Sequence, residues 1–424
     1  MPVLNAPLAR EIRGFSSALG MVLFILFLNT AIISLSGVVQ ANEPGVPYHR
    51  YVTAAGILYC FWFARSIAPI LRNSWTYVLF MLFVSLSISW AQSPSDAFQV
   101  TRYFIASFVG ALCAAVATGK NLRTFFQWVT PYFLIILVVS IYLCRSQPGV
   151  YAQPDSGRWL GITAHPNGLG AVAMSTIWCS LSLFVLSKSF GFRMISIAGI
   201  GAALICLKGS GSMTSIIASV GVATAFVYLL IVGRLHVGWR SLLVTASLLM
   251  FFSLAILLAV WPEALPVQQA IELVGRDTSF TGRTKLWQVA LELFRSRPLL
   301  GWGFDHLRDV ELTHGIQLTH LHNGYLDLLV RGGLVGITMV LSTMALLVVR
   351  VFGILSKDRI AGTVLAIGLI MILVHNVAEG SFGRGMNTLW LLYSFLFMHT
   401  SMRLWQPDEV NRSLSARRWN NMVA

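Results

Sequence analysis

Charged residues are scarce in this sequence: they make up 11% of the 424 residues, whereas hydrophobic residues make up 56%. A chain of this composition has too few polar side chains to cover itself with a polar surface in water. Its apolar runs are continuous rather than alternating, which argues against a transmembrane β-barrel and favours helices. The sequence therefore predicts an all-α, polytopic membrane protein.

Cysteines are few as well. Five of them (Cys60, Cys113, Cys144, Cys179 and Cys206) lie singly in apolar runs without C-x-x-C spacing, so we expect no disulfide, no metal site and no cofactor. The first apolar run is too long for the core of a cleavable signal peptide, and we expect it to remain as a signal anchor.

A membrane-spanning helix needs about 20 apolar residues. The stretch 192–208 is short and interrupted by glycines, so it either crosses the membrane or is re-entrant. Counting it as a crossing gives twelve expected spans, at 17–40, 51–69, 75–91, 100–118, 125–143, 168–187, 192–208, 212–233, 241–261, 323–350, 360–378 and 385–402.

The 30 basic residues predict the orientation, because Lys and Arg near the ends of spans resist translocation. With a cytoplasmic N-terminus, 17 basic and 4 acidic residues lie inside, and 13 basic and 12 acidic residues lie outside. Both termini are then cytoplasmic, and the net charge of +14 reflects topology and contact with anionic membrane lipid, with no nucleic-acid partner. The expected organisation is an N-terminal helix bundle (1–260), a large periplasmic loop (261–322), C-terminal spans (323–402) and a cytoplasmic tail (403–424).

Two shorter outer connections carry polar groups that suit a substrate. Residues 144–168 place Arg158, His165 and Asn167 at the start of a span, where Asn167 would cap the helix after Pro166. Such residues suit sugar hydroxyls, although an interfacial Arg that snorkels is the alternative. Residues 207–215, with Lys208, form either a phosphate cradle or a tight hairpin between two spans.

The long loop is the main candidate for hosting chemistry. Residues 281–295 have apolar positions at helical spacing, which predicts a helix whose stripe lies on the membrane surface and whose first turn carries Arg283. An Arg fork beside free backbone N–H groups suits a diphosphate, and a solvated surface Arg is the alternative. Arg308 is a further cation of this loop.

The loop re-enters the membrane through His320, His322 and Asn323. With His306 and His314 upstream these histidines raise a zinc hypothesis, but no third ligand stands at a standard spacing. A histidine at the membrane face is better suited to act as a general base for a sugar hydroxyl, and capping of the following helix is the alternative for His322. Asp327 and Arg331, one turn apart, are expected to pair.

Several short motifs together resemble the family of O-antigen ligases and Wzy-type polysaccharide polymerases, and most closely its exopolysaccharide-production branch. They are Gly161-x-x-x-His165-x-Asn167-x-Leu169-Gly170, Gly282-Arg283 with Leu286-Trp287, Pro298-Leu-Leu-Gly301-x-Gly303, His322-Asn323-x-Tyr325-Leu326 and Gly332-Gly333-x-x-Gly336. The chain departs from the family at Met213, where many relatives carry a basic residue, so either Lys208 supplies that charge or the second diphosphate anchor lies elsewhere.

This resemblance implies a GT-C-like, metal-independent, inverting glycosyltransferase of the inner membrane, with its active site on the periplasmic side. Its substrate would be an oligosaccharide on undecaprenyl diphosphate, and its expected partners are a chain-length regulator and export proteins of the same pathway. It implies that Arg283 holds the diphosphate and that His322 is the catalytic base, and we expect His320 to support His322. We expect Arg158, His165, Asn167, Lys208, Arg308 and Asn323 to bind substrate.

Three alternatives remain at this stage. A ligase that transfers glycan to a lipid A core is the nearest, because the motifs do not separate it from a polymerase. A transporter would carry ionisable residues in mid-span, whereas here they concentrate at outer ends. A purely structural membrane component would have no reason to concentrate Arg and His in one loop.

Overall fold

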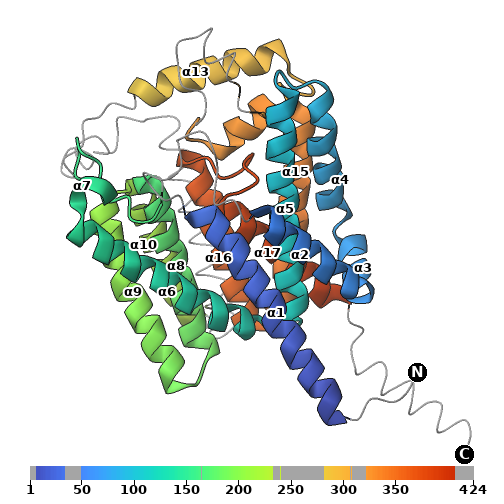
Figure 1. Ribbon diagram of the computed structural model, residues 1–424, viewed down its shortest axis with the longest axis vertical. Coiled ribbons are helices and arrows are strands. Elements are labelled where there is room, and N and C mark those ends of the chain that lie inside the picture. Colours follow the sequence, from blue (N-terminus) through green and yellow to red (C-terminus); the bar gives the residue numbers. More distant parts are fainter. Residues whose placement is uncertain are drawn as a thin grey trace, which may run out of the picture.

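The computed structural model describes residues 6–33, 49–163, 165–232, 239, 281–305, 307 and 321–405. Within these ranges the chain is helical, with one isolated antiparallel bridge between Ala152 and Trp159 and no β-strand. The predicted all-α architecture is therefore confirmed (Figure 1).

The helices follow the predicted apolar runs closely. Their bounds are α1 Ala6–Ile32, α2 His49–Trp62, α3 Ala64–Asn73, α4 Trp75–Leu86 with a 3-10 turn at Ser87–Ser89, α5 Pro94–Thr118, α6 Leu122–Ser146, α7 Pro148–Tyr151, α8 Pro166–Leu186, α9 Phe190–Ser210, α10 Met213–Val232, α13 Thr281–Ser296, α15 Gly324–Lys357, α16 Arg359–Ala378 and α17 Thr388–Trp405.

Among the described residues, 7 helices are long and apolar enough to cross a membrane, or up to 8 if a bent pair counts as one span. The stretch 192–208 lies in α9, an uninterrupted helix that passes this test. The expected span 241–261 lies outside the described residues. A polytopic membrane protein follows from these helices.

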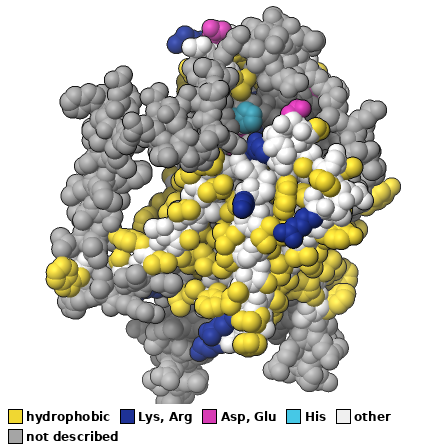
Figure 2. All heavy atoms as spheres, turned by 90° about the vertical axis from the view of Figure 1, so that its left-hand side faces the viewer, with side chains coloured by type: hydrophobic (Ala, Val, Ile, Leu, Met, Phe, Trp, Pro, Cys, Tyr) yellow, Lys and Arg dark blue, Asp and Glu magenta, His cyan; other side chains and the backbone are white. Residues whose placement is uncertain are grey.

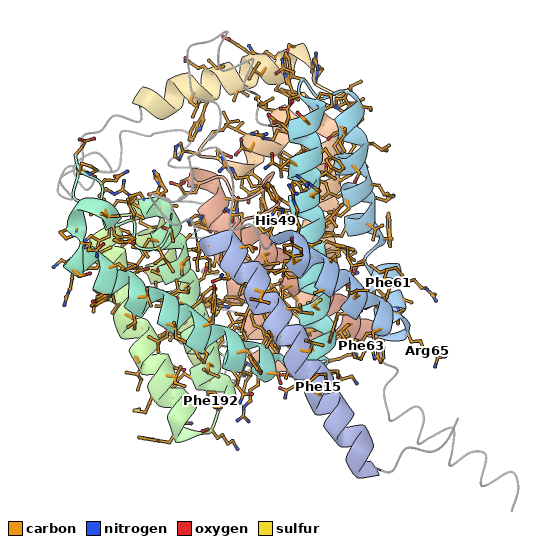
Figure 3. All side chains as sticks on the ribbon, in the orientation of Figure 1. Phe15, His49, Phe61, Phe63, Arg65 and Phe192 are labelled. Carbon is orange, nitrogen blue, oxygen red and sulfur yellow. The ribbon has the colours of Figure 1, made fainter. Side chains whose placement is uncertain are left out.

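The expected span 51–69 is not one straight helix. It consists of α2 and α3, which meet at an angle of 97° at Phe63. Beyond the bend, α3 buries Ile67 and Ile70 and exposes Arg65, which points away from the bundle beside Phe61 in Figure 3. Helix α3 carries Arg65 and Arg72, so it is better accommodated as an amphipathic helix along a membrane boundary than as the second half of a span.

Helix α17 lies in the middle of the bundle, in contact with α1, α3, α5 and α15. Its residues from Leu389 to Met398 are buried, and the ring of Phe395 stacks on Phe125 with centroids 3.7 Å apart. Trp390 meets Phe104 edge to face. Because lipid tails are as apolar as these side chains, such dense van der Waals packing is what holds helices together in a membrane.

The connections between helices gather at two opposite ends of the bundle. At the end where α1 begins and α17 ends, Arg403 donates to the carbonyl of Lys120 (2.9 Å) and lies 3.5 Å from the Asp358 carboxylate. The other end, which we call the loop end, holds Arg158, Asn167, Ser212, His322 and Glu379. This division is the one that alternating spans require.

The segment from Pro298 to Gly303 fixes the start of α15. Helix α15 has a break at Gly333 (φ 59°, ψ −161°), and the peptide groups released there bond to this segment. Gly303 donates to the carbonyl of Arg331 (2.9 Å), and Leu334 donates to the carbonyl of Pro298 (2.8 Å). A Cβ at Gly333 would lie 2.4 Å from the carbonyl oxygen of Leu299. The two glycine motifs of the sequence therefore form one structural junction.

Helix α13 lies across the loop end (Figure 1). The expectation that its apolar stripe rests on the membrane surface needs correction, because three of its residues, Leu286, Ala290 and Leu293, are buried against Leu321 and Val330. The stripe serves to dock α13 on the start of α15. This contact places α13 directly beside the residues that precede His322.

Candidate active site at the loop end

The structure brings four of the predicted site residues to the loop end: Arg158, His165, Asn167 and His322. Asn323 and Lys208 lie at neighbouring helix ends. Arg283 belongs to the first turn of α13, but its side chain is outside the described part of the structure, as are His320, Arg308 and the two further histidines of the zinc hypothesis.

The conformation of the chain at His322 presents its ring to the site. His322 has a left-handed backbone (φ 50°), an uncommon conformation for a residue with a side chain. Just before it, the indole Nε1 of Trp287 on α13 donates to the carbonyl of Leu321 (2.9 Å). The buried residue Leu321 before it and the start of α15 after it thus fix the position of His322.

The alternative role of His322 as a helix cap is wrong. Asn323 is the N-cap of α15, and its Oδ1 accepts from the backbone N–H groups of Tyr325 (3.0 Å) and Leu326 (3.1 Å). The expected role of Asn323 in binding substrate is therefore in competition with a structural one. The imidazole of His322 is left to interact with side chains.

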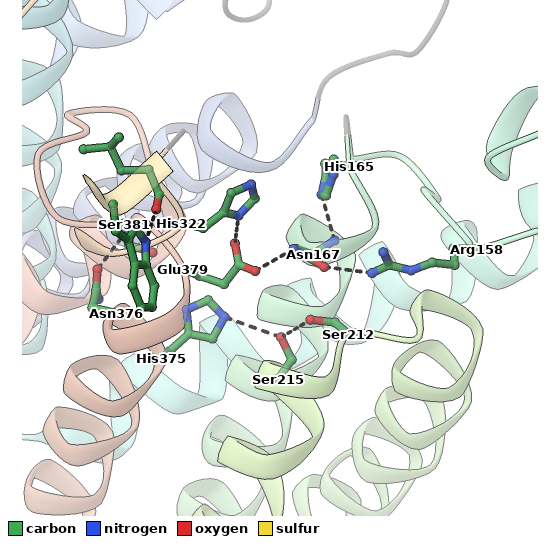
Figure 4. Close-up of polar contacts among 12 residues, drawn as sticks. Arg158, His165, Asn167, Ser212, Ser215, His322, His375, Asn376, Glu379 and Ser381 are labelled. Carbon is green, nitrogen blue, oxygen red and sulfur yellow. Dashed lines mark hydrogen bonds and ion pairs between the residues drawn. The ribbon is translucent and has the colours of Figure 1, made fainter. Parts of the chain in front are cut away.

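Its main partner is Glu379, which sequence reasoning did not identify. Nδ1 of His322 lies 3.3 Å from Oε2 of Glu379, the residue that directly follows α16 (Figure 4). The two side chains keep 30% and 12% of their surface exposed, so the pair is accessible but mostly enclosed by protein. The signal in the sequence was slight: Glu379 is the one carboxylate between Arg359 and Trp405.

The second carboxylate oxygen of Glu379 links the His322–Glu379 pair to the start of α8 and to the residues that precede it. Oε1 accepts from Nδ2 of Asn167 (2.6 Å), and Oδ1 of Asn167 accepts from Nη2 of Arg158 (2.8 Å). Arg158 also donates from Nε to the carbonyl of Ser210 (2.7 Å). A continuous line of hydrogen bonds therefore runs from Arg158 through Asn167 and Glu379 to His322 (Figure 4).

The expectation that Asn167 caps α8 is also wrong. His165 is the N-cap, and its Nδ1 accepts from the backbone N–H of Asn167 (3.1 Å). Pro166 is the first residue of the helix, so the capping position falls on the residue before it. Desolvation by the surrounding protein lowers the pKa of His165, with Arg158 and His322 acting in the same direction and Glu379 opposing them. A neutral imidazole is the form that can accept this hydrogen bond.

A second polar group lies beneath Glu379. Oγ of Ser212 donates to Oγ of Ser215 (3.0 Å), which lies 3.4 Å from Nε2 of His375, one helical turn before Glu379 on α16. Ser215 and His375 are buried. A Cβ at Gly170 would lie 2.6 Å from Cβ of Ser212, which explains the glycine at that position of the sequence motif. These residues join α8, α10 and α16 directly below the site.

The turn 207–215 has the geometry of a tight hairpin. Gly211 ends α9 in the left-handed conformation (φ 55°) and donates to the carbonyl of Leu207 (3.1 Å). Lys208 is exposed beside this turn, where it lines a cavity of about 620 Å³ together with Arg145 and Arg158. The structure thus assigns Lys208 to a cavity wall and leaves Ser212 and Ser215 in the packed layer below the site.

Glu379 is followed by a buried return loop that packs on Asp327. Asp327 and Arg331 form the expected pair, with Nε 3.9 Å from Oδ1. A Cβ at Gly380 would lie 2.5 Å from Oδ2 of Asp327, so a larger residue there would displace this carboxylate. Arg384 lies in the same loop, and burial lowers its pKa to about 10, which leaves it charged at neutral pH. The loop therefore ties Glu379 to the first turn of α15.

The sequence of this chain is similar to those of known families and proteins. Residues 198–341 match the Wzy_C family, described as O-antigen ligase. The exopolysaccharide production protein ExoQ of Rhizobium meliloti is 27% identical over 301 residues, which cover 66% of each chain. An O-antigen ligase of Pseudomonas aeruginosa is 26% identical over 352 residues, 79% of each chain.

These similarities confirm the resemblance to an O-antigen ligase and ExoQ-like family. The matched family region includes α10, α13 and His322, whereas Arg158, Asn167 and Glu379 lie outside it. The chain spans just under two thirds of the length of the exopolysaccharide production protein.

Proposed function

We propose that this protein is an integral-membrane glycosyltransferase that polymerises oligosaccharides carried on undecaprenyl diphosphate, in the synthesis of an exopolysaccharide. The observation that supports this most directly is the His322–Glu379 pair, at the membrane end of a loop-rich face. The similar proteins, one named for exopolysaccharide production and one an O-antigen ligase, fit this class of reaction.

In the proposed reaction His322 acts as the general base. Glu379 accepts from Nδ1–H, so the basic lone pair is on Nε2. Nε2 takes the proton of an acceptor hydroxyl while the hydroxyl oxygen attacks the anomeric carbon of the donor sugar. The bond from that carbon to the diphosphate oxygen breaks, and undecaprenyl diphosphate leaves with the electron pair. Attack opposite to the leaving group inverts the anomeric configuration.

The leaving diphosphate needs positive charge. Arg283, in the first turn of α13, is the residue that we propose for this, because an Arg fork next to helix N–H groups matches a phosphate in shape and charge. The residues named here require no metal ion, and we propose that the reaction is metal-independent. Activity should therefore persist in excess EDTA.

We further propose that the loop end faces the periplasm and that both termini are cytoplasmic, in the inner membrane. The support is the distribution of basic residues, 17 against 13, together with the separation of the connections to opposite ends of the bundle. A periplasmic site receives donors that are already lipid-linked, so it needs no nucleotide-sugar site.

A ligase that transfers glycan to a lipid A core is the second candidate. It is favoured by the similarity to the O-antigen ligase, which covers the larger share of the chain. The two reactions share the donor and differ in the acceptor. Analysis of a deletion strain distinguishes them, because loss of long lipid-linked chains indicates a polymerase and loss of capped lipopolysaccharide indicates a ligase.

The test of the catalytic assignment is His322→Asn in purified protein supplied with a lipid-linked oligosaccharide. Asparagine tolerates the left-handed backbone of residue 322, so the fold is retained. Loss of a general base typically costs about 100- to 10,000-fold in rate. Polymer formation at the wild-type rate by this variant would contradict the assignment, and His165 or His320 would be the next candidates for the base.

A further inference from the structure

The cavity beside the site is lined by several basic side chains. Its volume is about 620 Å³, and its described lining includes the cations Arg145, Arg158 and Lys208 but no acidic side chain. Trp159 lies against the backbone of Gly209, where an added Cβ would meet the indole at 2.3 Å. Arg145 and Lys208 are exposed, and Arg158 is half-buried. A cavity of this kind favours an anion with several oxygen acceptors.

The cavity also borders the surface that faces lipid. Ile205 forms part of its wall, and α9 exposes Ile197 and Leu204 further along the same helix. Figure 2 shows this side of the molecule as a broad hydrophobic face, with Lys and Arg side chains in its upper part and at its lower edge. A ligand with an anionic group at the end of a long apolar chain therefore matches both parts of the surface at once.

The position of the cavity relative to His322 indicates which ligand this is. Arg158 belongs to the cavity wall, and it is separated from His322 by the side chains of Asn167 and Glu379. The diphosphate of a glycosyl donor is bonded to the reacting anomeric carbon on the side opposite to the base, so only that carbon and the attacking oxygen separate it from the base. The diphosphate of a lipid-linked acceptor lies at the other end of its oligosaccharide from the reacting hydroxyl.

We propose that the Arg145–Arg158–Lys208 cavity binds the diphosphate of the lipid-linked acceptor, with the polyprenyl chain along α9. This inference rests on the proposed function and extends it, since it assigns two separate diphosphate sites to the donor and the acceptor. The acceptor oligosaccharide then extends from the cavity to His322. Its hydroxyl loses a proton to His322 and bonds to the donor carbon, and the acceptor keeps its own diphosphate.

The first experiment measures binding directly. Full-length protein in detergent is titrated with undecaprenyl diphosphate, which carries no sugar, and the complexes are counted by native mass spectrometry. We expect two bound molecules for the wild type, and at least about tenfold weaker binding of one of them for Arg145→Gln with Lys208→Gln, since charge-assisted contacts to phosphate are lost. The matched control is Lys188→Gln with Lys357→Gln, two exposed lysines at the opposite end of the bundle.

A parallel titration with phosphatidylglycerol distinguishes the lipid substrate from ordinary membrane lipid. Unchanged diphosphate binding in the cavity variant overturns the proposal. The proposal is also overturned if the cavity variant binds phosphatidylglycerol and undecaprenyl diphosphate more weakly to the same extent, because the cavity is then a general phospholipid site.

The second experiment measures transfer rates. The cavity variant should raise the KM for the lipid-linked acceptor by about tenfold or more, with the KM for the donor and transfer to a lipid-free oligosaccharide unchanged. A rise in the donor KM instead would make the cavity the donor site and refute the proposal. If the wild type binds two lipid diphosphates but transfers no sugar, the proposed function fails, and the acceptor assignment fails with it while a diphosphate site remains.

Discussion

Replacing Glu379 by Gln tests the proposed mechanism at its most specific point. The hydrogen bonds determine how the new side chain must sit. Arg158 can only donate, so Oδ1 of Asn167 is an acceptor and Nδ2 is the donor that faces Glu379. The amide oxygen of the introduced glutamine must accept from Asn167, and its NH₂ group then points at Nδ1 of His322.

This arrangement changes the tautomer of His322. Nδ1 must accept from the new amide, so the proton moves to Nε2, which is the atom proposed to act as the base. The variant therefore loses the basic position as well as a carboxylate, and we expect kcat to fall by about 100- to 10,000-fold, the range typical of a lost general base. Loss of the charge alone would weaken the hydrogen bond to His322 by only about 1–2 kcal/mol, the difference between a charged and a neutral hydrogen bond.

The assay is single-turnover transfer from a lipid-linked donor by purified protein, with Glu292→Gln as the control, since Glu292 is an exposed acid on α13. The ¹⁵N chemical shifts of labelled His322 report the tautomer independently of activity. A wild-type rate with an unchanged tautomer would refute the reasoning. A normal tautomer with a low rate would show that Glu379 acts in some other way than by orienting His322.

Three further predictions concern the parts that support the site. Trp287→Phe keeps an aromatic ring but removes the donor to the buried carbonyl of Leu321, so turnover should fall while the free energy of unfolding falls by about 1–3 kcal/mol; equal turnover would contradict this role. Gly333→Ala should lower thermal stability strongly, by about 1–3 kcal/mol for the backbone strain alone, whereas Gly353→Ala, in open space on the same helix, should not. A cysteine introduced at position 309 should react with an impermeant reagent from outside and one at position 357 should not, and labelling at 357 would refute the proposed topology.

The spans could be predicted well because each depends only on a long apolar run. The bend at Phe63 was missed because the hydrophobicity averaged over 51–69 is high in spite of Arg65. Burying this charge in the membrane would be unfavourable, and the bend between α2 and α3 avoids it. The convergence of Arg158, Asn167 and His322 was predictable in outline, since alternating spans bring every second connection to the same end. Which atoms meet there depends on packing between helices far apart in sequence.

The capping hypotheses for Asn167 and for His322, the second of which was only an alternative, failed for a different reason. Both concern neighbouring polar residues that compete for one position, His322 with Asn323 and His165 with Asn167. At α15 the stronger capping residue, Asn, takes the position. At α8, Pro166 fixes the first helical residue, so the weaker capping residue His165 takes it. Glu379 could not be identified as a site residue from the sequence, because a single acidic residue between two spans is equally consistent with a solvated turn.

The cap at His165 makes stability depend on pH, and the sign can be worked out from its pKa. The pKa of His165 lies below the usual value of 6.5, mainly because of desolvation, while the unfolded chain keeps the ordinary value. Above pH 6.5 both states are neutral and the full stability is present. As the pH falls below 6.5, the unfolded state takes up the proton first, so stability is lost progressively until the folded state also protonates.

His165→Asn removes this dependence, because Asn caps a helix without titrating in this range. Thermal unfolding of wild type and variant in detergent between pH 5 and 7.5 should give curves that converge near neutral pH and separate in acid. The wild type should be less stable there by less than about 1 kcal/mol, the typical worth of a cap, because His165 is exposed and solvent screens the effect. His165→Ala should be less stable than the Asn variant at every pH. Parallel pH curves for wild type and His165→Asn would show that Nδ1 of His165 does not cap α8. The side chain of Asn167 would still be positioned by Arg158 and Glu379.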